Sequence, residues 1–279
     1  MEPLFSVVMA YFNRKPLLLR TLNSISASKQ ASNTEVVIVD DGSVEEHRLE
    51  DIVNNYNFKI KLIRIEPEEK WYTNPWIPFN KGFKEAEADT IIIQNPECYH
   101  FGDILDYSTN LKSNQYFSYH AYSLNQEVTE QVDHLNPVEI NSKGYSFYDH
   151  PHADVAEYLP LVSPLRLPNV GTNLEGKLGY YNHRTFRPHA FHFCCAIKRE
   201  DLLDLEGFDE RYAEGRAFDD NEFILRVGRK GLDVIFVSYP LVLHQWHYEG
   251  YEPDFGEKFQ RNMHLFQNIT MQERGWRVN

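Results

Sequence analysis

The stretch TIIIQNPE at residues 90–97 decides how the rest of the sequence is interpreted. Three consecutive isoleucines form a short, β-branched, apolar run, which is typical of a central strand buried on both faces. Proline cannot donate to a sheet ladder, so the strand is expected to end by Pro96. Open α/β sheets bind ligands outside the carboxyl ends of their strands, and this end carries Asn95 and Glu97. Taken alone, the stretch is also compatible with an ordinary polar strand end.

The composition is that of a globular protein with many aromatic side chains. Of 279 residues, 42% are hydrophobic and 25% charged, which is ordinary, whereas 14% aromatic is high and favours flat ligand-contacting surfaces. The net charge of −13 argues against a nucleic-acid backbone or an anionic membrane as the main partner. A nucleotide ligand is still compatible with this charge, because a local cation or backbone amides suffice to bind it.

The cysteines and the hydropathy pattern bear on the cellular location of the protein. The 3 cysteines, two of them adjacent at Cys194 and Cys195, form neither a disulfide framework nor a CxxC metal site. No stretch approaches the ~20 apolar residues of a membrane span. The N-terminus MEPLFSVVMA lacks the features of a signal peptide. We therefore expect a cytoplasmic protein without a transmembrane segment.

Strands and helices alternate in the first part of the chain. Buried strands are predicted at residues 4–10 and 35–39, a third, partly alternating strand at 58–65, and the isoleucine strand after them. Helices are predicted at residues 16–26, 45–56 and 79–88, and residues 66–78 are irregular. From residue 1 to about residue 106, this order predicts a parallel sheet with right-handed crossovers.

The second part of the chain contains one long irregular insert. A strand is predicted at residues 115–124, after which residues 125–188 hold six prolines and are interpreted as a functional lid. Then follow a strand at 191–198, a short helix at 199–203, an amphipathic helix at 219–230, a strand at 234–237 and a stretch at 241–247 that leads away from it. A terminal helix at 256–271 is expected to pack on the domain or on a second subunit. Its apolar residues are Phe259, Met263, Phe266 and Ile269.

Polar residues follow two of the predicted strands. Asp40 and Asp41 come after the second strand, where a Gly-Ser pair permits a tight turn, and a carboxylate there can accept from a base or a ribose hydroxyl. A turn or helix-cap role is the alternative for this pair. Asn95 and Glu97 lie two residues apart, on one side of an extended chain. Because Mg²⁺ and Mn²⁺ take oxygen ligands, Glu97 is a candidate metal ligand, the alternative being a surface glutamate after a proline.

Two further groups lie in the second half. Asp219 and Asp220 open the amphipathic helix, where the macrodipole explains acidic residues about as well as a general-base role does. His244 and His247 follow an apolar stretch, and imidazole is a frequent metal ligand, although a lone histidine more often has a structural role. The cluster at residues 150–154 (HPHAD) lies in the insert and is interpreted as loop.

Taken together and in this order, these segments resemble the family 2 glycosyltransferases of the GT-A fold. The resemblance rests on SVVMAYFNR (6–14), VVIVDDGS (36–43), NKG (80–82), GFDERY (207–212) and FDDNEFILRVGRKG (218–231), and extends over about residues 5–102 and 191–247. It implies an α/β fold with a mixed, mostly parallel Rossmann-like sheet flanked by helices. It also implies one GT-A domain over residues 1–279. Its parts are a nucleotide-binding half (1–106), an acceptor-side half (107–247) with the insert, and a helical tail (248–279).

The resemblance assigns roles residue by residue. The nucleoside, uridine being the first choice, would be held by Ala10, Tyr11, Asn13 and Asp40 or Asp41. Further donor-binding candidates are Asn80 and Lys81 in the N-x-G element, Asn95 on the ribose or ion, and Cys195 near the donor sugar. Glu97 would bind the divalent ion, with His244 or His247 as a further metal or phosphate ligand. Asp220, or Asp219, would be the catalytic base.

The sequence departs from the family pattern at Asn95-Pro96-Glu97, which stands in the place of the family's D-x-D. Replacement of the first aspartate by Asn95 removes one negative charge, so a lower metal affinity is expected. If no metal is needed, Lys81 or an arginine would neutralise the diphosphate.

The predicted function is an inverting glycosyltransferase that moves a sugar from a nucleotide-diphospho-sugar, with UDP as first choice, to a hydroxyl of a glycan or other acceptor. Mn²⁺ or Mg²⁺ is the predicted cofactor, no nucleic acid is expected as partner, and a homo-oligomer is left open. One alternative is a non-catalytic nucleotide-sugar or glycan-binding protein on the same fold. Another is a sugar nucleotidyltransferase, which would release pyrophosphate.

Overall fold

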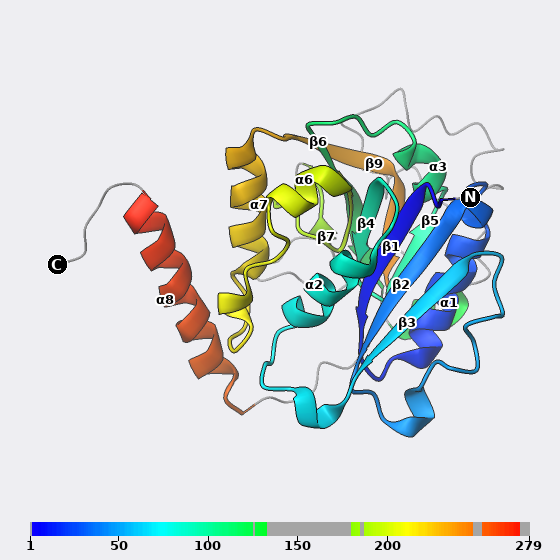
Figure 1. The fold of residues 1–279 in the computed structure, drawn as a ribbon, viewed down its shortest axis with the longest axis horizontal. Coiled ribbons are helices and arrows are strands. Elements are labelled where there is room, and N and C mark those ends of the chain that lie inside the picture. The colour runs from blue at the N-terminus through cyan, green and yellow to red at the C-terminus, as the bar shows by residue number, and fades with distance from the viewer. Residues whose placement is uncertain (1, 125, 133–179, 185–186, 248–252, 274–279) are drawn as a thin grey trace.

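The computed structural model describes residues 2–124, 126–132, 180–184, 187–247 and 253–273 (Figure 1). Most of the predicted lid at residues 125–188, including the cluster at 150–154, lies outside the described residues. Among the described helices, none combines the length and the apolar character needed to cross a membrane.

The described strands form one mixed sheet. They are β1 (Phe5–Tyr11), β2 (Thr34–Asp41), β3 (Lys59–Ile65), β4 (Thr90–Gln94), β5 (Cys98–Phe101), β6 (Gln115–Ser123), β7 (Tyr180–Asn182), β8 (Cys194–Lys198) and β9 (Asp233–His244). Their order across the sheet is β3-β2-β1-β4-β8-β6-β9-β5, and β7 pairs with β6. The first four strands of this order run parallel, as predicted. Strand β8 is antiparallel to both β4 and β6, whereas β6 and β9 are parallel.

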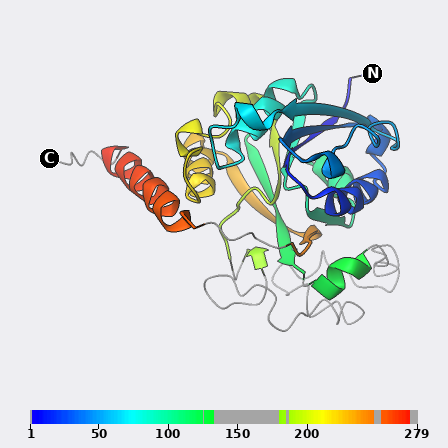
Figure 2. The same ribbon diagram turned by 90° about the horizontal axis from the view of Figure 1, so that it is seen from below.

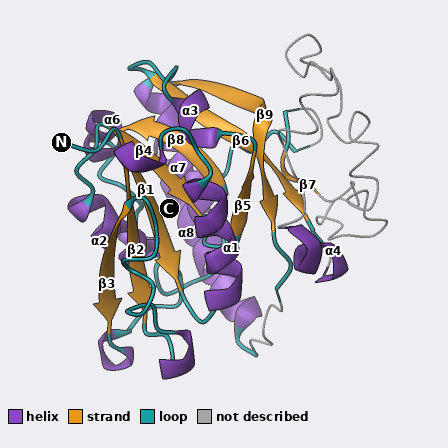
Figure 3. Cartoon of the chain, turned by 90° about the vertical axis from the view of Figure 1, so that its right-hand side faces the viewer, coloured by secondary structure: helices purple, strands orange, loops and turns teal. Residues whose placement is uncertain are grey.

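Helices cover both faces of the sheet (Figures 1 and 3). The α-helices are α1 (Lys15–Ser26), α2 (Trp76–Glu85), α3 (Ile104–Ser108), α4 (Gln126–Gln131), α6 (Arg199–Asp204), α7 (Asp219–Lys230) and α8 (Phe255–Glu273). Short 3-10 turns are η1 (Ala31–Asn33), η2 (Glu45–His47), η3 (Pro67–Glu69) and η7 (Glu210–Tyr212). Helices α1 and α3 pack on one face, and α2, α6 and α7 pack on the other.

The isoleucine strand lies in the middle of these layers. Ile91 and Ile93 pack with the core under α2 and α7, whereas Ile92 packs with the core under α1. All three are fully buried, which confirms the prediction of a strand covered on both faces. The strand ends at Gln94, two residues before Pro96.

The predicted helix at residues 45–56 is wrong. Only Glu45–His47 forms a turn of 3-10 helix, and the next residue, Arg48, is extended. The hydroxyl of Tyr11 donates to the His47 carbonyl at 2.7 Å, and Lys15 Nζ donates to the Arg48 carbonyl at 2.8 Å. Side chains of distant elements therefore occupy the carbonyls that a helix would need, and tertiary contacts override the local pattern.

Other boundaries differ in ways that proline and pairing explain. Helix α2 begins at Trp76 and not at residue 79, because Pro75 and Pro78 fit the cap and first turn of a helix. The predicted strand at 234–237 and the stretch at 241–247 are mostly one strand, β9, which pairs with β6 through a register shift. Strand β5 was not predicted; it follows the turn after β4 and pairs with β9.

Helix α8 packs on the domain, one of the two placements that its apolar residues predict. Phe218, just before α7, contacts Phe259 and Phe266 with ring centroids 5.1 and 5.6 Å apart. Asn262 is fully buried, and its amide donates to the carbonyls of Tyr212 and Ala217. Helix α8 is thereby tied to the segment that leads into α7 (Figures 1 and 2).

We expect Gly82→Ala to destabilise the fold, because α2 approaches the sheet closely at this residue. A Cβ atom on Gly82 would lie 2.5 Å from Cγ1 of the buried Val8. This overpacking costs about 1–3 kcal/mol, more than the ~1 kcal/mol of helix propensity gained over glycine. Urea denaturation measures the effect, with Lys81→Ala on the exposed side of α2 as the control. An unchanged or increased free energy of unfolding would contradict the packing argument.

Candidate active site

The predicted polar residues gather at one edge of the sheet. The parallel strands β1, β2 and β4 end there, and β8, being antiparallel, begins there, with Cys194 opposite Gln94. Because β9 is parallel to β6, and β6 is antiparallel to β8, β9 also ends at this edge. Such an edge is where open α/β sheets bind ligands.

Glu97, His244 and His247 form a cluster that fits a metal ion. The Glu97 Oε1 atom lies 3.2 Å from Nε2 of His244 and 3.6 Å from Nε2 of His247. The potential ligand atoms of the three residues all lie within 4.8 Å of one another. Glu97 is 3% exposed, and Nδ1 of His247 is buried without a hydrogen-bond partner. One carboxylate and two imidazoles converging on one point are a suitable donor set for a divalent transition metal.

The backbone around Glu97 is fixed by neighbouring segments. Both the main-chain N–H and the side-chain amide of Gln245 donate to the Glu97 carbonyl, at 3.0 and 3.2 Å. The N–H of Asn95 donates to the Phe193 carbonyl, and the N–H of Cys98 donates to the Asn95 carbonyl. Asn95 is half-buried two residues before Glu97. It is therefore still a candidate to contact the ribose or the ion.

Arg14 balances the charge of Glu97. Its Nη1 atom lies 3.1 Å from Glu97 Oε2, so one carboxylate oxygen meets the guanidinium and the other meets the histidines. Burial disfavours ionisation of Glu97, but Arg14, His244 and His247 together hold its pKa well below its usual value. No specific role was predicted for Arg14, although it ends the SVVMAYFNR segment. Glu97 is 83 residues away, and no local pattern connects the two.

The two aspartates at the start of α7, Asp219 and Asp220, lie in different environments. Asp220 Oδ1 contacts Nδ1 of His192 and accepts from the His192 N–H at 3.3 Å. Its side chain is 24% exposed. Asp219 is buried, and its Oδ1 accepts from the Asn74 amide at 3.2 Å. Because Asp220 is the more accessible carboxylate, it is the better candidate for a base that contacts a ligand.

Electrostatics in this group depend on burial and on mutual repulsion. Burial, followed by the Asp220 carboxylate, raises the pKa of Asp219 to about 7. Burial alone would lower the pKa of His192, but Asp220 and Asp219 raise it above its usual value. His192 and Asn74 were not singled out from the sequence. His192 is the second residue of the predicted strand at 191–198, and Asn74 lies in the irregular segment before α2. The available signal was a polar residue in an apolar setting.

We expect stability to fall as pH rises through the range in which Asp219 ionises. The unfolded chain releases this proton near pH 4, whereas the native protein keeps it up to about pH 7. The native state therefore binds more protons between these values, and stability decreases with pH there. Asp219→Asn removes this term, so the variant should gain on the order of 1–3 kcal/mol over wild type at pH 8 relative to pH 4. Denaturant unfolding at both pH values, with Asp51→Asn as surface control, measures it; equal pH dependence in variant and wild type would contradict it.

The loops after β1 and β2 are tied together beside the cluster. Asn13 accepts from the Val44 N–H at 2.9 Å, and its own N–H donates to Ser43 Oγ at 3.0 Å. Asp40 is fully buried and pairs with Arg64 at 2.8 Å. Asp41 accepts from the hydroxyl of Tyr72 at 2.6 Å and pairs with Lys70 at 2.9 Å. Asp41 is thus the more accessible of the two carboxylates for a nucleoside.

Exposed aromatic rings lie near Lys70, the ion-pair partner of Asp41, in space or in the chain. Phe12 and Trp71 are 47% and 60% exposed, and Lys70 Nζ lies 4.5 Å from the centre of the Phe12 ring. Flat apolar surfaces of this kind suit stacking against a base or a sugar.

Two donor-binding candidates lie in the core. The Tyr11 side chain is fully buried and donates to the His47 carbonyl, so it can reach a ligand only through its backbone. Cys195 is fully buried in β8, and burial raises its pKa to about 12. A central strand covered on both faces exposes neither of its alternating side chains, which explains this placement. Ala10, by contrast, is half-buried near the end of β1, at the sheet edge where the polar residues gather.

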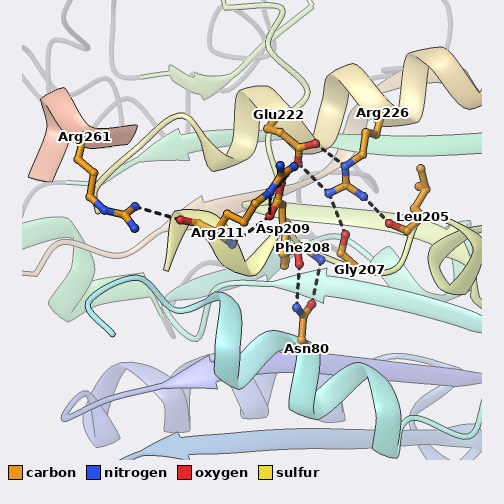
Figure 4. Close-up of polar contacts among 9 residues, drawn as sticks. All are labelled: Asn80, Leu205, Gly207, Phe208, Asp209, Arg211, Glu222, Arg226 and Arg261. Atoms are coloured by element: carbon orange, nitrogen blue, oxygen red, sulfur yellow. Dashed lines mark hydrogen bonds and ion pairs between the residues drawn. The ribbon is translucent and has the colours of Figure 1, made fainter. Parts of the chain in front are cut away.

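The N-x-G element proves to be structural at two of its three residues. The Asn80 amide donates to the Phe208 carbonyl, and its oxygen accepts from the Phe208 N–H (Figure 4). The amide also donates to Glu210 Oε1. Gly82 allows α2 to approach the sheet, as described above. Lys81, between them, is exposed. Helical periodicity could have revealed this, because residue 80 falls on the same helix face as Trp76 and Phe83.

Comparisons with known proteins place the fold. Residues 6–107 match the family model described as glycosyl transferase family 2. S. aureus TarS 1-349 in complex with UDP-GlcNAc aligns with a TM-score of 0.60 and 16% identity, covering 97% of this chain and 67% of that chain. The mannosyltransferase PcManGT from Pyrobaculum calidifontis, in complex with GDP-Man and Mn²⁺, aligns with a TM-score of 0.51 and 15% identity, covering 90% of this chain and 59% of that chain. None of the curated proteins compared matches the chain.

The structural relatives are longer than this chain, which spans only 40% of S. aureus TarS in a further structure. The family match begins in β1 and runs into α3, so it contains Glu97 and the loops after β1, β2 and β4. The predicted resemblance and the predicted GT-A fold are confirmed: residues 6–107 match the glycosyl transferase family 2 model, and the chain has the fold of the GT-A glycosyltransferases with which it aligns.

Proposed function

We propose that this protein is an inverting glycosyltransferase that transfers a sugar from a nucleotide-diphospho-sugar to an acceptor hydroxyl. The observation that carries the proposal is the convergence of Glu97, His244 and His247 at the sheet edge within a family 2 fold. A carboxylate of suitable accessibility, Asp220, stands at the same edge through its contact with His192. A leaving-group site and a base are the two groups that such a reaction requires.

The donor side is proposed as a UDP-sugar site. Of the two relatives above, TarS has the higher TM-score and was solved with UDP-GlcNAc, which makes UDP the first choice and GDP the second. Asp41 and the exposed rings of Phe12 and Trp71 would meet the nucleoside. Asp40, held by Arg64, would shape the loop that carries Asp41.

The metal site is proposed to hold Mn²⁺ in preference to Mg²⁺. Mg²⁺ prefers oxygen ligands, whereas the cluster offers two imidazole nitrogens and one carboxylate. PcManGT, at 15% identity, was solved with Mn²⁺. When bound, the ion would supply Lewis-acid stabilisation of the negative charge on the leaving diphosphate. Arg14, which contacts Glu97, supplies further positive charge at this edge, the role that the sequence left to Lys81 or an arginine.

The chemistry is proposed as a single displacement. Asp220 accepts the proton of the acceptor hydroxyl, whose oxygen forms a bond to the anomeric carbon as the bond to the diphosphate breaks. The attack comes from the side opposite the leaving group, so the configuration inverts. Positioning of the acceptor against the donor and the electrostatics of the leaving group provide most of the rate enhancement.

Further parts of the proposal concern organisation. We infer one domain, in which residues 1–106 bind the nucleotide and residues 107–247 bind the acceptor, with residues 248–279 as a helical tail. The three cysteines are free and buried, which supports a reducing, cytoplasmic location.

Donor hydrolysis tests the proposal without knowledge of the acceptor. The protein is incubated with UDP-, GDP- and dTDP-sugars, with Mn²⁺ or with EDTA, and released nucleotide and pyrophosphate are measured. Metal-dependent release of one nucleoside diphosphate is expected. Release of pyrophosphate would instead identify a nucleotidyltransferase. Donor binding without turnover, with a panel of glycan acceptors present, would identify a binding protein and overturn the proposal.

A further inference from the structure

We propose that His192 is a positioning residue for the base Asp220: it fixes one carboxylate oxygen and leaves the other to receive the proton of the acceptor hydroxyl. The inference rests on the proposed function, because it gives Asp220 the role of base.

The two oxygens of Asp220 are in different situations. Oδ1 meets both Nδ1 of the His192 ring and, at 3.3 Å, the His192 main-chain N–H. Among the described residues, none hydrogen-bonds to Oδ2. An ionised carboxylate can only accept, so in this contact Nδ1 of His192 carries the proton. The two hydrogen bonds from His192 to Oδ1 restrict rotation of the Asp220 carboxylate. Oδ2 is left as the oxygen available to a ligand.

His192 is itself held rigidly by aromatic rings. It is 6% exposed, and its ring centre lies 4.9 Å from that of Trp76, 5.4 Å from that of Phe79 and 5.0 Å from that of Phe208. Two of these rings belong to α2, and the third belongs to the segment before η7. The imidazole therefore has one fixed orientation, and its Nδ1 edge faces Asp220.

The segment around Phe208 is anchored by polar contacts on both sides (Figure 4). Asn80 binds both the N–H and the carbonyl of Phe208, each at 2.8 Å. Arg226 of α7 donates to the carbonyls of Leu205 and Gly207 and pairs with Glu222. These contacts connect α2, the Phe208 segment and α7, which carries Asp220. They also explain the role of Asn80, which does not contact the proposed donor site. Asn80 holds Phe208, one of the rings against which His192 packs.

In the reaction, His192 keeps its proton throughout. The acceptor proton passes to Oδ2 of Asp220, while Oδ1 remains hydrogen-bonded to His192, so no second transfer is needed. Asp219 is buried beside the pair and accepts from Asn74, so this second carboxylate does not reach the acceptor. The contribution of His192 is therefore orientation of the base, which should appear in kcat and not in donor affinity.

Matched variants of His192 test the inference. Asparagine places an amide N–H near the position of Nδ1, whereas leucine fills similar space without a donor. We expect His192→Leu to lower kcat about 10–100-fold with donor KM within about threefold, and His192→Asn to recover most of the loss. Phe208→Leu, which loosens the wall but removes no contact to Asp220, is the packing control. A wild-type kcat in His192→Leu, or equal losses in the asparagine and leucine variants, would overturn the inference.

A spectroscopic readout separates this inference from the proposed function. In ¹H–¹⁵N spectra, the pKa of the His192 ring should fall when Asp220→Asn removes the carboxylate, whether or not any donor turns over. An unchanged ring titration would overturn the pairing. If the wild type turns over no donor, the proposed function fails and the catalytic role of His192 fails with it. If the wild type is active and His192→Leu is equally active, only the role of His192 fails.

Discussion

Replacement of Glu97 by alanine is expected to abolish metal-dependent turnover. Glu97 is the carboxylate shared by His244, His247 and Arg14, and each of these groups would lose its anionic partner. Loss of one electrostatic contribution to the leaving group costs about 10²–10³ in kcat. Mn²⁺ affinity should fall by at least tenfold, measured by calorimetry with UDP present.

The effect should be specific to the site. Asp51 also pairs with a cation, Lys15, but lies at the surface, so Asp51→Ala should change neither Mn²⁺ affinity nor turnover. Glu97→Gln keeps the shape of the side chain and removes its charge, which separates electrostatics from packing. Full Mn²⁺ stimulation in Glu97→Ala would rule out Glu97 as a metal ligand. Wild-type turnover that survives EDTA would keep the transferase and remove the metal from the mechanism.

Asp220→Asn is expected to remove most turnover while leaving donor binding intact. The amide keeps the hydrogen bond from His192 but cannot take a proton from an acceptor. General-base catalysis contributes about 10²–10⁴ to the rate, and a loss within this range is expected in kcat. The Kd for UDP in the presence of Mn²⁺ should stay within about threefold of wild type, because the metal cluster is intact.

Asp219→Asn serves as the comparison for this second prediction. Asp219 is buried and accepts from Asn74, so its replacement should lower kcat much less than that of Asp220. If Asp219→Asn were inactive and Asp220→Asn active, the two residues would exchange roles. If both variants kept wild-type kcat, the acidic pair would not supply the base, and the accessible carboxylate would have to be sought elsewhere.

The sequence predicts most of the fold because the deciding signals are local. The β-branched run at residues 91–93 and the amphipathic pattern of α7 depend only on neighbouring residues, and the structure confirms both. The helix predicted at 45–56 failed because Tyr11 and Lys15, more than 30 residues away, bind the carbonyls that it would need. Such contacts exist only after the chain has folded, so no local pattern reveals them.

The site residues also separate into those that local sequence signals identify and those that depend on distant partners. Glu97, His244 and His247 could be selected by residue type and by their position at strand ends, and the structure brings the three together. Arg14 could not, because its importance lies in its contact with Glu97, and His192 gave only the weak signal of a polar residue in an apolar setting. Asn80 was selected by resemblance alone, although its helix face already indicated burial. Tyr11 and Cys195 were likewise selected by place in a motif, and the core covers both.

The position of Mn²⁺ in crystals grown with UDP tests the proposed metal site most directly. Anomalous scattering locates the ion independently of any assumption about the site. One peak is expected at ligand distance from Glu97, His244 and His247, with UDP beside it and its nucleoside toward Asp41. A UDP-bound crystal with the Mn²⁺ peak elsewhere, or with these three side chains making no contact to metal or nucleotide, would contradict it.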